Sequence, residues 1–122
     1  MIQIAPVIRT ELLKHADRVY LHNAPATKVF PYVVFHFPTC FSLAGQDILN
    51  LDVDVWDNSP DTTTLDTLAR NIWNSLDRLC HIDNDQQFSI FRMNRLMLDD
   101  DDPQIQRRKL IFQLRLIDRG NS

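Results

Sequence analysis

The sequence predicts an α+β domain: an antiparallel four- or five-stranded sheet with two helices packed on one face. Residues 49–56 alternate apolar and polar side chains, which is typical of a half-buried strand. Residues 65–80 carry apolar side chains at intervals of three and four, as an amphipathic helix does. The predicted order is helix, strand, strand, helix, strand, strand, so the apolar stripe of the helix and the apolar face of the sheet can bury each other.

Residues 4–16 predict the first helix, because Ile8, Leu12 and Ala16 recur at every fourth position. Residues 19–21 follow either as the last turn of this helix or as a short extended piece. The two alternatives stay open at this point.

Residues 32–37 predict the first long strand, because β-branched and aromatic side chains dominate them and a proline stands at each end. A turn around Gly45 separates this strand from residues 49–56. The second helix follows a further turn, with either Ser59 or Asp61 as its N-terminal cap.

Residues 88–98 and 109–117 predict two more strands. Between them stand four consecutive aspartates and then Pro103: Asp99, Asp100, Asp101 and Asp102. Four adjacent negative charges do not fit a packed strand ladder, so this run predicts an exposed hairpin loop. Solvation explains such a charge run, and contact with the basic surface of a partner is the alternative.

Length and composition predict a single domain over residues 1–122 and exclude several classes of protein. With 13 Lys plus Arg against 16 Asp plus Glu, the net charge of -3 disfavours stable binding to nucleic acid. No apolar stretch approaches the roughly 20 residues that a membrane span needs. The amino terminus lacks the apolar core of a signal peptide, which favours a protein that is cytosolic when made.

Asp52 and Asp54 are the candidates for a metal site. Two residues apart on one strand, their side chains point the same way with Cα atoms roughly 7 Å apart, and could bracket a divalent metal ion as in nucleases. The simpler interpretation, which we favour, is an ordinary solvated face. No Glu or His elsewhere completes a recognisable motif, so the sequence predicts no metal ion here.

Other chemical motifs are incomplete. Asp83 and Asp85 begin like a calcium loop, but neither a ligand nor a glycine follows. No serine stands in a GxSxG motif, and the two glycines are too few for a phosphate-binding loop. We interpret Cys80 as a core residue and His81 as a histidine at a helix C-terminus. The sequence therefore predicts no catalytic residue and no cofactor, and the protein is not expected to be an enzyme.

Apolar and aromatic side chains are in surplus. Tyr32, Val34 and Trp56 fall on strand faces that one layer of helices cannot all cover. A surplus of this kind marks a subunit interface more often than a pocket.

Four short strings stand out along the chain: VFPYVVF at 29–35, LDVDVWD at 51–57, LDRL at 76–79 and RRKLIFQLRL at 107–116. Together with the order of elements over residues 12–118, they resemble the tail-completion proteins (tail terminators and head-to-tail joining proteins) of long-tailed bacteriophages and prophages. The aspartate-rich hairpin departs from the family pattern.

The resemblance implies a structural virion subunit that is made in the host cytoplasm. It implies a six-membered ring around the DNA channel, at the head–tail joint or the tail end, with head–tail connector and tail-tube proteins as partners. It carries over no catalytic residue. An acidic subunit suits a channel through which DNA slides without sticking. We therefore expect a set of residues to line the lumen or contact the adjoining ring: Asp52, Asp54, Trp56, Asp99, Asp100, Asp101 and Asp102.

Two alternatives belong to other classes. One is a metal-dependent nuclease or phosphoesterase that uses Asp52 and Asp54. The other is a small binding module that dimerises through its sheet edge.

Overall fold

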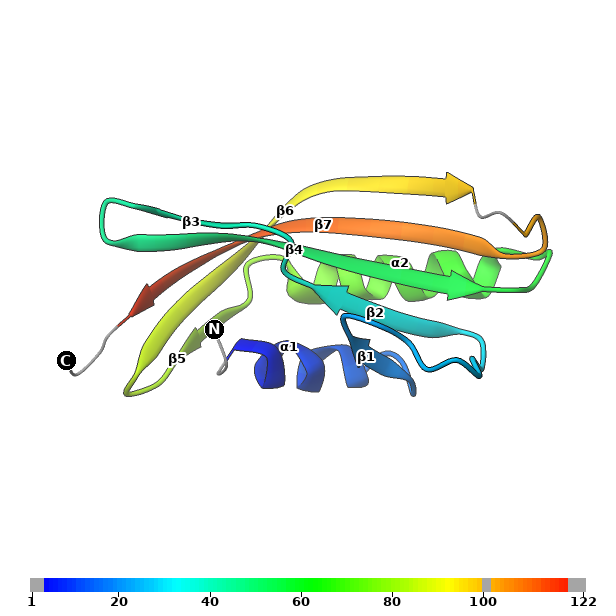
Figure 1. Ribbon diagram of the computed structural model, residues 1–122, viewed down its shortest axis with the longest axis horizontal. Coiled ribbons are helices and arrows are strands. Elements are labelled where there is room, and N and C mark those ends of the chain that lie inside the picture. The colour runs from blue at the N-terminus through cyan, green and yellow to red at the C-terminus, as the bar shows by residue number, and fades with distance from the viewer. Residues whose placement is uncertain (1–3, 100–101, 119–122) are drawn as a thin grey trace.

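The computed structural model describes residues 4–99 and 102–118. The described residues form two helices, α1 (Ile4–Leu13) and α2 (Thr63–Leu76), and one curled sheet (Figure 1). The strands of this sheet are β1 (Val19–Leu21), β2 (Tyr32–His36), β3 (Cys40–Leu43), β4 (Gln46–Asp57), β5 (Cys80–Ile82), β6 (Gln86–Asp99) and β7 (Gln106–Asp118). The predicted α+β class is therefore confirmed.

The number of strands was predicted wrongly, because the described sheet has seven strands and not four or five. Its order is β1-β2-β4-β7-β6-β5, and β3 pairs separately with the first part of β4. The sheet is not wholly antiparallel either, since β1 runs parallel to β2. Residues 19–21 form β1, so of the two alternatives left open there the extended one is correct. The unpredicted strands β3 and β5 have only four and three residues, which is too short for an alternating pattern to identify them.

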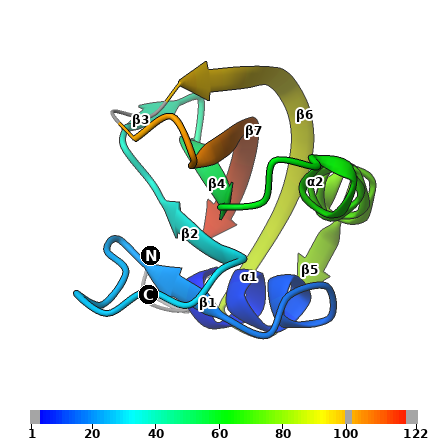
Figure 2. The same cartoon turned by 90° about the vertical axis from the view of Figure 1, so that its right-hand side faces the viewer.

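The hydrophobic core lies between the helices and one face of the sheet. On β4 and β7 the core side chains stand at every second position, as strand geometry requires. Both helices contribute to this same core, so the prediction that they pack on one face is confirmed (Figure 2). The core positions of the two central strands are Leu49, Leu51, Val53, Val55, Leu110, Phe112, Leu114 and Leu116.

Helix α2 ends at Leu76, four residues before its predicted end. Arg78 has a positive φ of 60°, a conformation that breaks the helix, and the chain then enters β5. Cys80 is exposed on β5, so the prediction of a core cysteine is wrong. His81 does not lie at a helix C-terminus, because it is also in β5, where its Nε2 lies 2.8 Å from Asp83 Oδ2.

The N-terminus of α2 is fixed by Asp61. The backbone N–H of Thr63 donates to Asp61 Oδ1 at 3.0 Å, and the Thr63 hydroxyl donates to the same oxygen at 2.7 Å. These two hydrogen bonds hold the pKa of Asp61 below its ordinary value. The N-cap residue is Thr62, whose side chain makes no capping hydrogen bond, so the prediction of Ser59 or Asp61 as the cap is wrong; Asp61 binds the helix from one position earlier.

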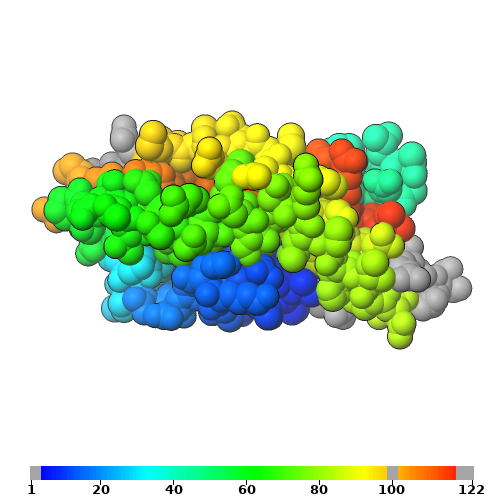
Figure 3. All heavy atoms as spheres, turned by 180° about the vertical axis from the view of Figure 1, so that it is seen from behind, coloured from blue at the N-terminus to red at the C-terminus, as the bar shows by residue number. Residues whose placement is uncertain are grey.

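Helices α1 and α2 lie side by side over the far side of the molecule (Figure 3). The Ser75 hydroxyl of α2 donates to Glu11 Oε2 of α1 at 2.6 Å, and Lys14 Nζ donates to Glu11 Oε1 at 3.0 Å. Partial burial alone would raise the pKa of Glu11. The hydrogen bonds from Ser75 and Lys14, with the charges of Lys14 and His15, outweigh that effect and hold the pKa below its ordinary value of 4.5.

Replacing Glu11 with glutamine should therefore change how stability depends on pH. A lowered folded-state pKa means that the Glu11 carboxylate stabilises the fold above the unfolded-state pKa, and that this contribution is lost as pH falls through the folded-state pKa. We expect Glu11→Gln to be less stable by about 1 kcal/mol at neutral pH. The difference should shrink between about pH 5 and about pH 3 in urea unfolding followed by circular dichroism. A difference that stays constant over this range would contradict the assignment.

Strands β6 and β7 form a long hairpin, as predicted from the aspartate run between them. A β-bulge between Arg92 and Asn94 interrupts their register, and β6 bends strongly along its length (Figure 2).

No helix among the described residues is long and apolar enough to cross a membrane.

Candidate functional site

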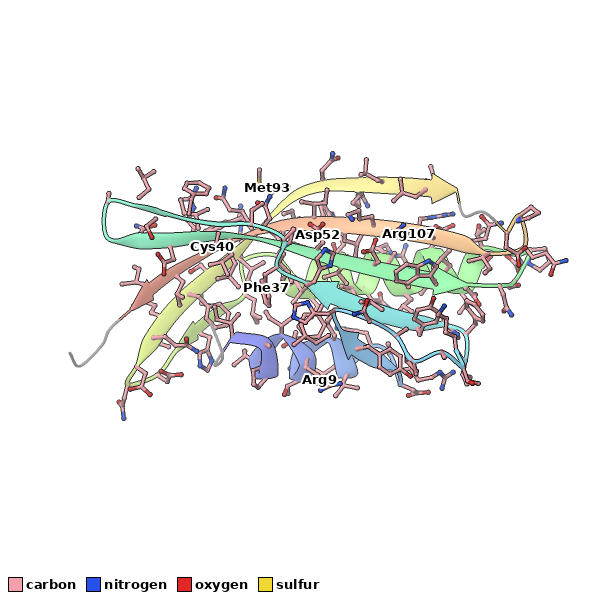
Figure 4. The ribbon with its side chains drawn as sticks, in the orientation of Figure 1. Arg9, Phe37, Cys40, Asp52, Met93 and Arg107 are labelled. Carbon is pink, nitrogen blue, oxygen red and sulfur yellow. The ribbon has the colours of Figure 1, made fainter. Side chains whose placement is uncertain are left out.

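The sheet face opposite the helices is the candidate functional surface, and we call it the open face. Strand alternation and register define its members. Asp54 pairs with Lys109, and Trp56 pairs with Arg107, so the predicted site residues of β4 lie beside cations of β7. Figure 4 labels Asp52 on β4 and Arg107 on β7. The open face comprises Tyr32, Val34 and His36 of β2, Ile48, Asn50, Asp52, Asp54 and Trp56 of β4, and Arg107, Lys109, Ile111, Gln113 and Arg115 of β7.

An ionic cluster occupies the middle of the open face. Arg107 donates twice to Asp54 Oδ1, from Nε at 3.1 Å and from Nη2 at 3.0 Å. Lys109 Nζ lies 3.2 Å from Asp52 Oδ2 and 3.8 Å from Asp54 Oδ2. His36 Nε2 lies 3.8 Å from Asp52 Oδ2. Three strands thus contribute to one network that brings Asp52 and Asp54 together with their counterions.

Asp52 and Asp54 are buried, with only 8% and 2% of their surface exposed. The interpretation of this strand face as an ordinary solvated one is therefore wrong. Burial of two carboxylates requires compensation, and here Arg107 and Lys109 supply it. Within the described part of the chain, no group of three His, Cys, Asp or Glu side chains is placed to hold a metal ion.

Aromatic rings line the open face next to the ionic cluster. Tyr32 stacks on Trp56 with ring centroids 5.1 Å apart, and Phe30 and Tyr20 contact Tyr32 from other directions. The Arg107 guanidinium lies over the Trp56 ring, 4.8 Å from its centroid. Tyr32 is buried as a result, and Trp56 is half-buried.

The expected surplus of exposed apolar surface exists, but on other residues than predicted. Tyr32 and Val34 are each only 5% exposed, so the prediction assigned the exposed apolar surface to the wrong residues. The exposed apolar side chains near the sheet edges include Phe41 and Leu43 of β3, Ile82 of β5, and Phe91, Met93, Leu96 and Met97 of β6. Aromatic residues, methionine and arginine are enriched in protein interfaces, and Arg115 lies over the ring of Phe91 here.

The aspartate run is only partly described. Asp99 is the last residue of β6, and its side chain lies outside the description, as do Asp100 and Asp101. Asp102 is exposed, and its Oδ1 accepts a hydrogen bond from the backbone N–H of Gln104 at 2.9 Å. The structure thus does not bring the described part of this run together with Asp52 and Asp54, and its proposed role stays a prediction.

Asp83 serves the turn between β5 and β6. Its Oδ1 accepts hydrogen bonds from the backbone N–H groups of Asp85 and Gln86. The hydrogen bond from His81, together with these two, holds the pKa of Asp83 below its ordinary value. The segment that begins like a calcium loop is therefore a turn, which Asp83 stabilises by accepting hydrogen bonds from the backbone of the next residues.

Sequence reasoning missed His36, Arg107 and Lys109 as partners of the two aspartates. A signal was present for the cations, because Arg107 and Lys109 stand two residues apart at open-face positions of the last strand. Matching them to Asp54 and Asp52 requires the register between β4 and β7, which no local pattern contains.

The comparisons with known proteins bear on the fold. No family model and no curated protein matches the sequence. Among solved structures, the chain is similar to a chain from the virion of a native gene transfer agent particle, with a TM-score of 0.71 and 12% identity. The match covers 89% of this chain and 90% of that one. The two chains therefore share a fold over nearly their whole lengths.

Proposed function

We propose that the protein is a structural subunit of a phage-like particle and acts by shape and subunit contacts. The observation that carries this proposal is the fold shared with a chain of the gene transfer agent virion, over nine-tenths of both chains.

In its finer form, the proposal is a tail-completion role. Several copies, six by resemblance to the tail-completion proteins, would form a ring around the DNA channel at the head–tail joint or the tail end. Head–tail connector and tail-tube proteins would be its partners. A closed ring needs two different patches on each subunit, and exposed apolar side chains on both β3 and β6 meet that requirement.

Within this ring, the open face would have a mechanical role. Asp52 and Asp54 hold Arg107 and Lys109 in place, and Arg107 in turn packs over Trp56. We propose that Trp56 and Arg107 contact the adjoining ring, while the run from Asp99 to Asp102 faces the lumen and keeps DNA phosphates from settling there. The alternative of a nuclease gains no support, because the carboxylates of Asp52 and Asp54 already have Arg107 and Lys109 as partners.

Deleting the gene from its source replicon tests the proposal. We expect DNA-filled heads and tails that fail to join, or tails of uncontrolled length, in negative-stain electron microscopy. Re-expression of the chain should restore complete particles and place the protein in purified virions, as detected by mass spectrometry. Normal particles without the protein would overturn the proposal.

A further inference from the structure

The outer edge of β6 is unpaired over much of its length. Strand β5 pairs only with residues 87–89 of β6. Backbone hydrogen bonds from Arg78 and to Leu79 cover Ile90, and the Arg92 N–H donates to Asp77 Oδ1. Beyond Arg92, β6 has β7 on one side and no described strand on the other.

This free stretch of β6 is apolar and exposed. Met93, Leu96 and Met97 have 57%, 37% and 79% of their surface exposed. Proline and charged side chains commonly protect an edge strand from pairing with another chain; residues 93–98 contain no proline, and Arg95 is their single charged side chain. An edge of this kind favours the addition of a strand from another chain.

A second unpaired edge lies on the other side of the sheet. Strand β3 pairs with β4 on one side, and no described strand covers its outer side. All four of its residues are exposed, and Phe41 and Leu43 are 54% and 60% exposed. Strand β1, the remaining edge on that side, is much less accessible, because Val19 is buried and Tyr20 and Leu21 are half-buried.

We propose that the outer edge of β6 in one copy of the protein pairs with the outer edge of β3 in the next copy, so that the sheet continues from subunit to subunit. The inference deepens the proposed ring and rests on it, because it names the two patches of the subunit contact. Edges on opposite sides of one sheet give a head-to-tail contact, which closes into a ring when the rotation between neighbouring copies divides a full turn.

The two edges match in the faces of their side chains. On β3, Phe41 and Leu43 stand on the open face, since Phe41 pairs with Ile48. On β6, Leu96 stands on the open face, since it pairs with Lys109. A continuous sheet therefore places Leu96 beside Phe41 or Leu43, and apolar surface meets apolar surface.

The charges match on the opposite face. Arg95 of β6 pairs with Leu110, so it points toward the helix side, where it lies over the ring of Trp73. Beside β3 on that same side lies Asp47, which accepts a hydrogen bond from Ser42 at 2.6 Å. The proposed contact brings an arginine of one copy toward an aspartate of the next.

Pairing of β6 with β6 of a second copy is disfavoured by the same charges. Such a symmetric contact would bring Arg92 and Arg95 of one copy beside the arginines of the other, and like charges on neighbouring strands are destabilising. This consideration favours β3, which has no charged residue, as the partner strand.

The native cysteine Cys40 of β3 makes the contact testable by disulfide cross-linking. In a Cys80→Ser background of the full chain, cysteine would be introduced at Met97 or at Arg95, both on the same sheet face as Cys40. The matched control is Asn94→Cys, next to Arg95 but on the opposite face, since Asn94 pairs with Ile111. After mild oxidation of the concentrated protein, at least one of the first two variants should form Cys40-linked oligomers roughly tenfold more than the control, because disulfides tolerate only short Cβ separations.

Each outcome decides a separate question. Removal of Cys40 by Cys40→Ser should abolish the linked ladder, and Phe41→Glu should reduce it without unfolding the chain. Links between two introduced cysteines would show a β6–β6 dimer and overturn the inference. Hexamers in native mass spectrometry without Cys40 links would overturn the β6–β3 contact and leave the proposed ring standing. Monomers throughout, with no links, would overturn the contact, while the deletion phenotype would still decide the proposed function.

Discussion

Replacing Phe112 with alanine is expected to lower the free energy of unfolding by about 4 kcal/mol. Phe112 lies on β7 in the middle of the core, has none of its surface exposed, and contacts the ring of Trp73 with centroids 5.3 Å apart. The loss combines the transfer of the ring to water with the cavity that is left between sheet and α2. Urea unfolding followed by circular dichroism measures it.

Phe41→Ala is the matched control for this prediction. The same side chain is removed from β3, where it is 54% exposed, so the free energy of unfolding should change by no more than about 0.5 kcal/mol. Equal losses for the two variants would mean that the core does not lie where the structure has it. Because the whole free energy of unfolding of such a domain is roughly 5 to 15 kcal/mol, Phe112→Ala is expected to be close to unfolding at elevated temperature.

Replacing Asp54 with alanine is expected to cost about 3 kcal/mol, nearly as much as the core substitution. The variant leaves Arg107 without its only described carboxylate partner and Lys109 with Asp52 alone. Since the side chains of Arg107 and Lys109 keep 27% and 19% exposure, water can hydrate them in part, which places the cost at the lower end of the range for broken buried pairs. The midpoint of urea unfolding at neutral pH measures this cost.

Asp66→Ala is the control for Asp54→Ala. Asp66 also pairs with an arginine, Arg108, at 2.9 Å, but its side chain is 53% exposed. Arg108 keeps only 14% exposure, but the carboxylate that is removed is largely hydrated, so loss of this half-exposed pair should cost about 1 kcal/mol. If Asp54→Ala costs no more than Asp66→Ala, the ionic cluster does not stabilise the fold.

The long elements could be predicted from the sequence because their patterns are local. The two-residue alternation of β4 and the three-and-four spacing of α2 each recur over several turns or pairs. Strands β3 and β5 have no such repeat, since four and three residues give no period, and β1 could not be told from a helical turn. These short strands form because neighbouring strands supply their hydrogen-bond partners. Which strands are neighbours is decided by the tertiary fold and not by the local sequence.

In the candidate site, too, the parts set by a local pattern could be predicted, and the parts set by tertiary contacts could not. Asp52, Asp54 and Trp56 were identified correctly as one face of one strand, but their burial depends on Arg107 and Lys109, more than fifty positions away in the chain. The surplus of apolar surface was predicted correctly in kind. Its position was not, because whether Phe41 or Met97 is exposed depends on which strands end up at the sheet edges.

The register between β4 and β7 has a consequence for how the chain folds during its synthesis. Asp57 pairs with Gln106 and Asp47 with Leu116, so this central ladder joins segments roughly 50 to 70 residues apart, a topology that folds slowly. The apolar face of β4 leaves the ribosome well before its partner strand exists. Strands β2 and β3 are already made by then, but at about 5 to 20 residues per second the edge of β4 that pairs with β7 waits several seconds for its partner, and a chaperone can bind in that interval.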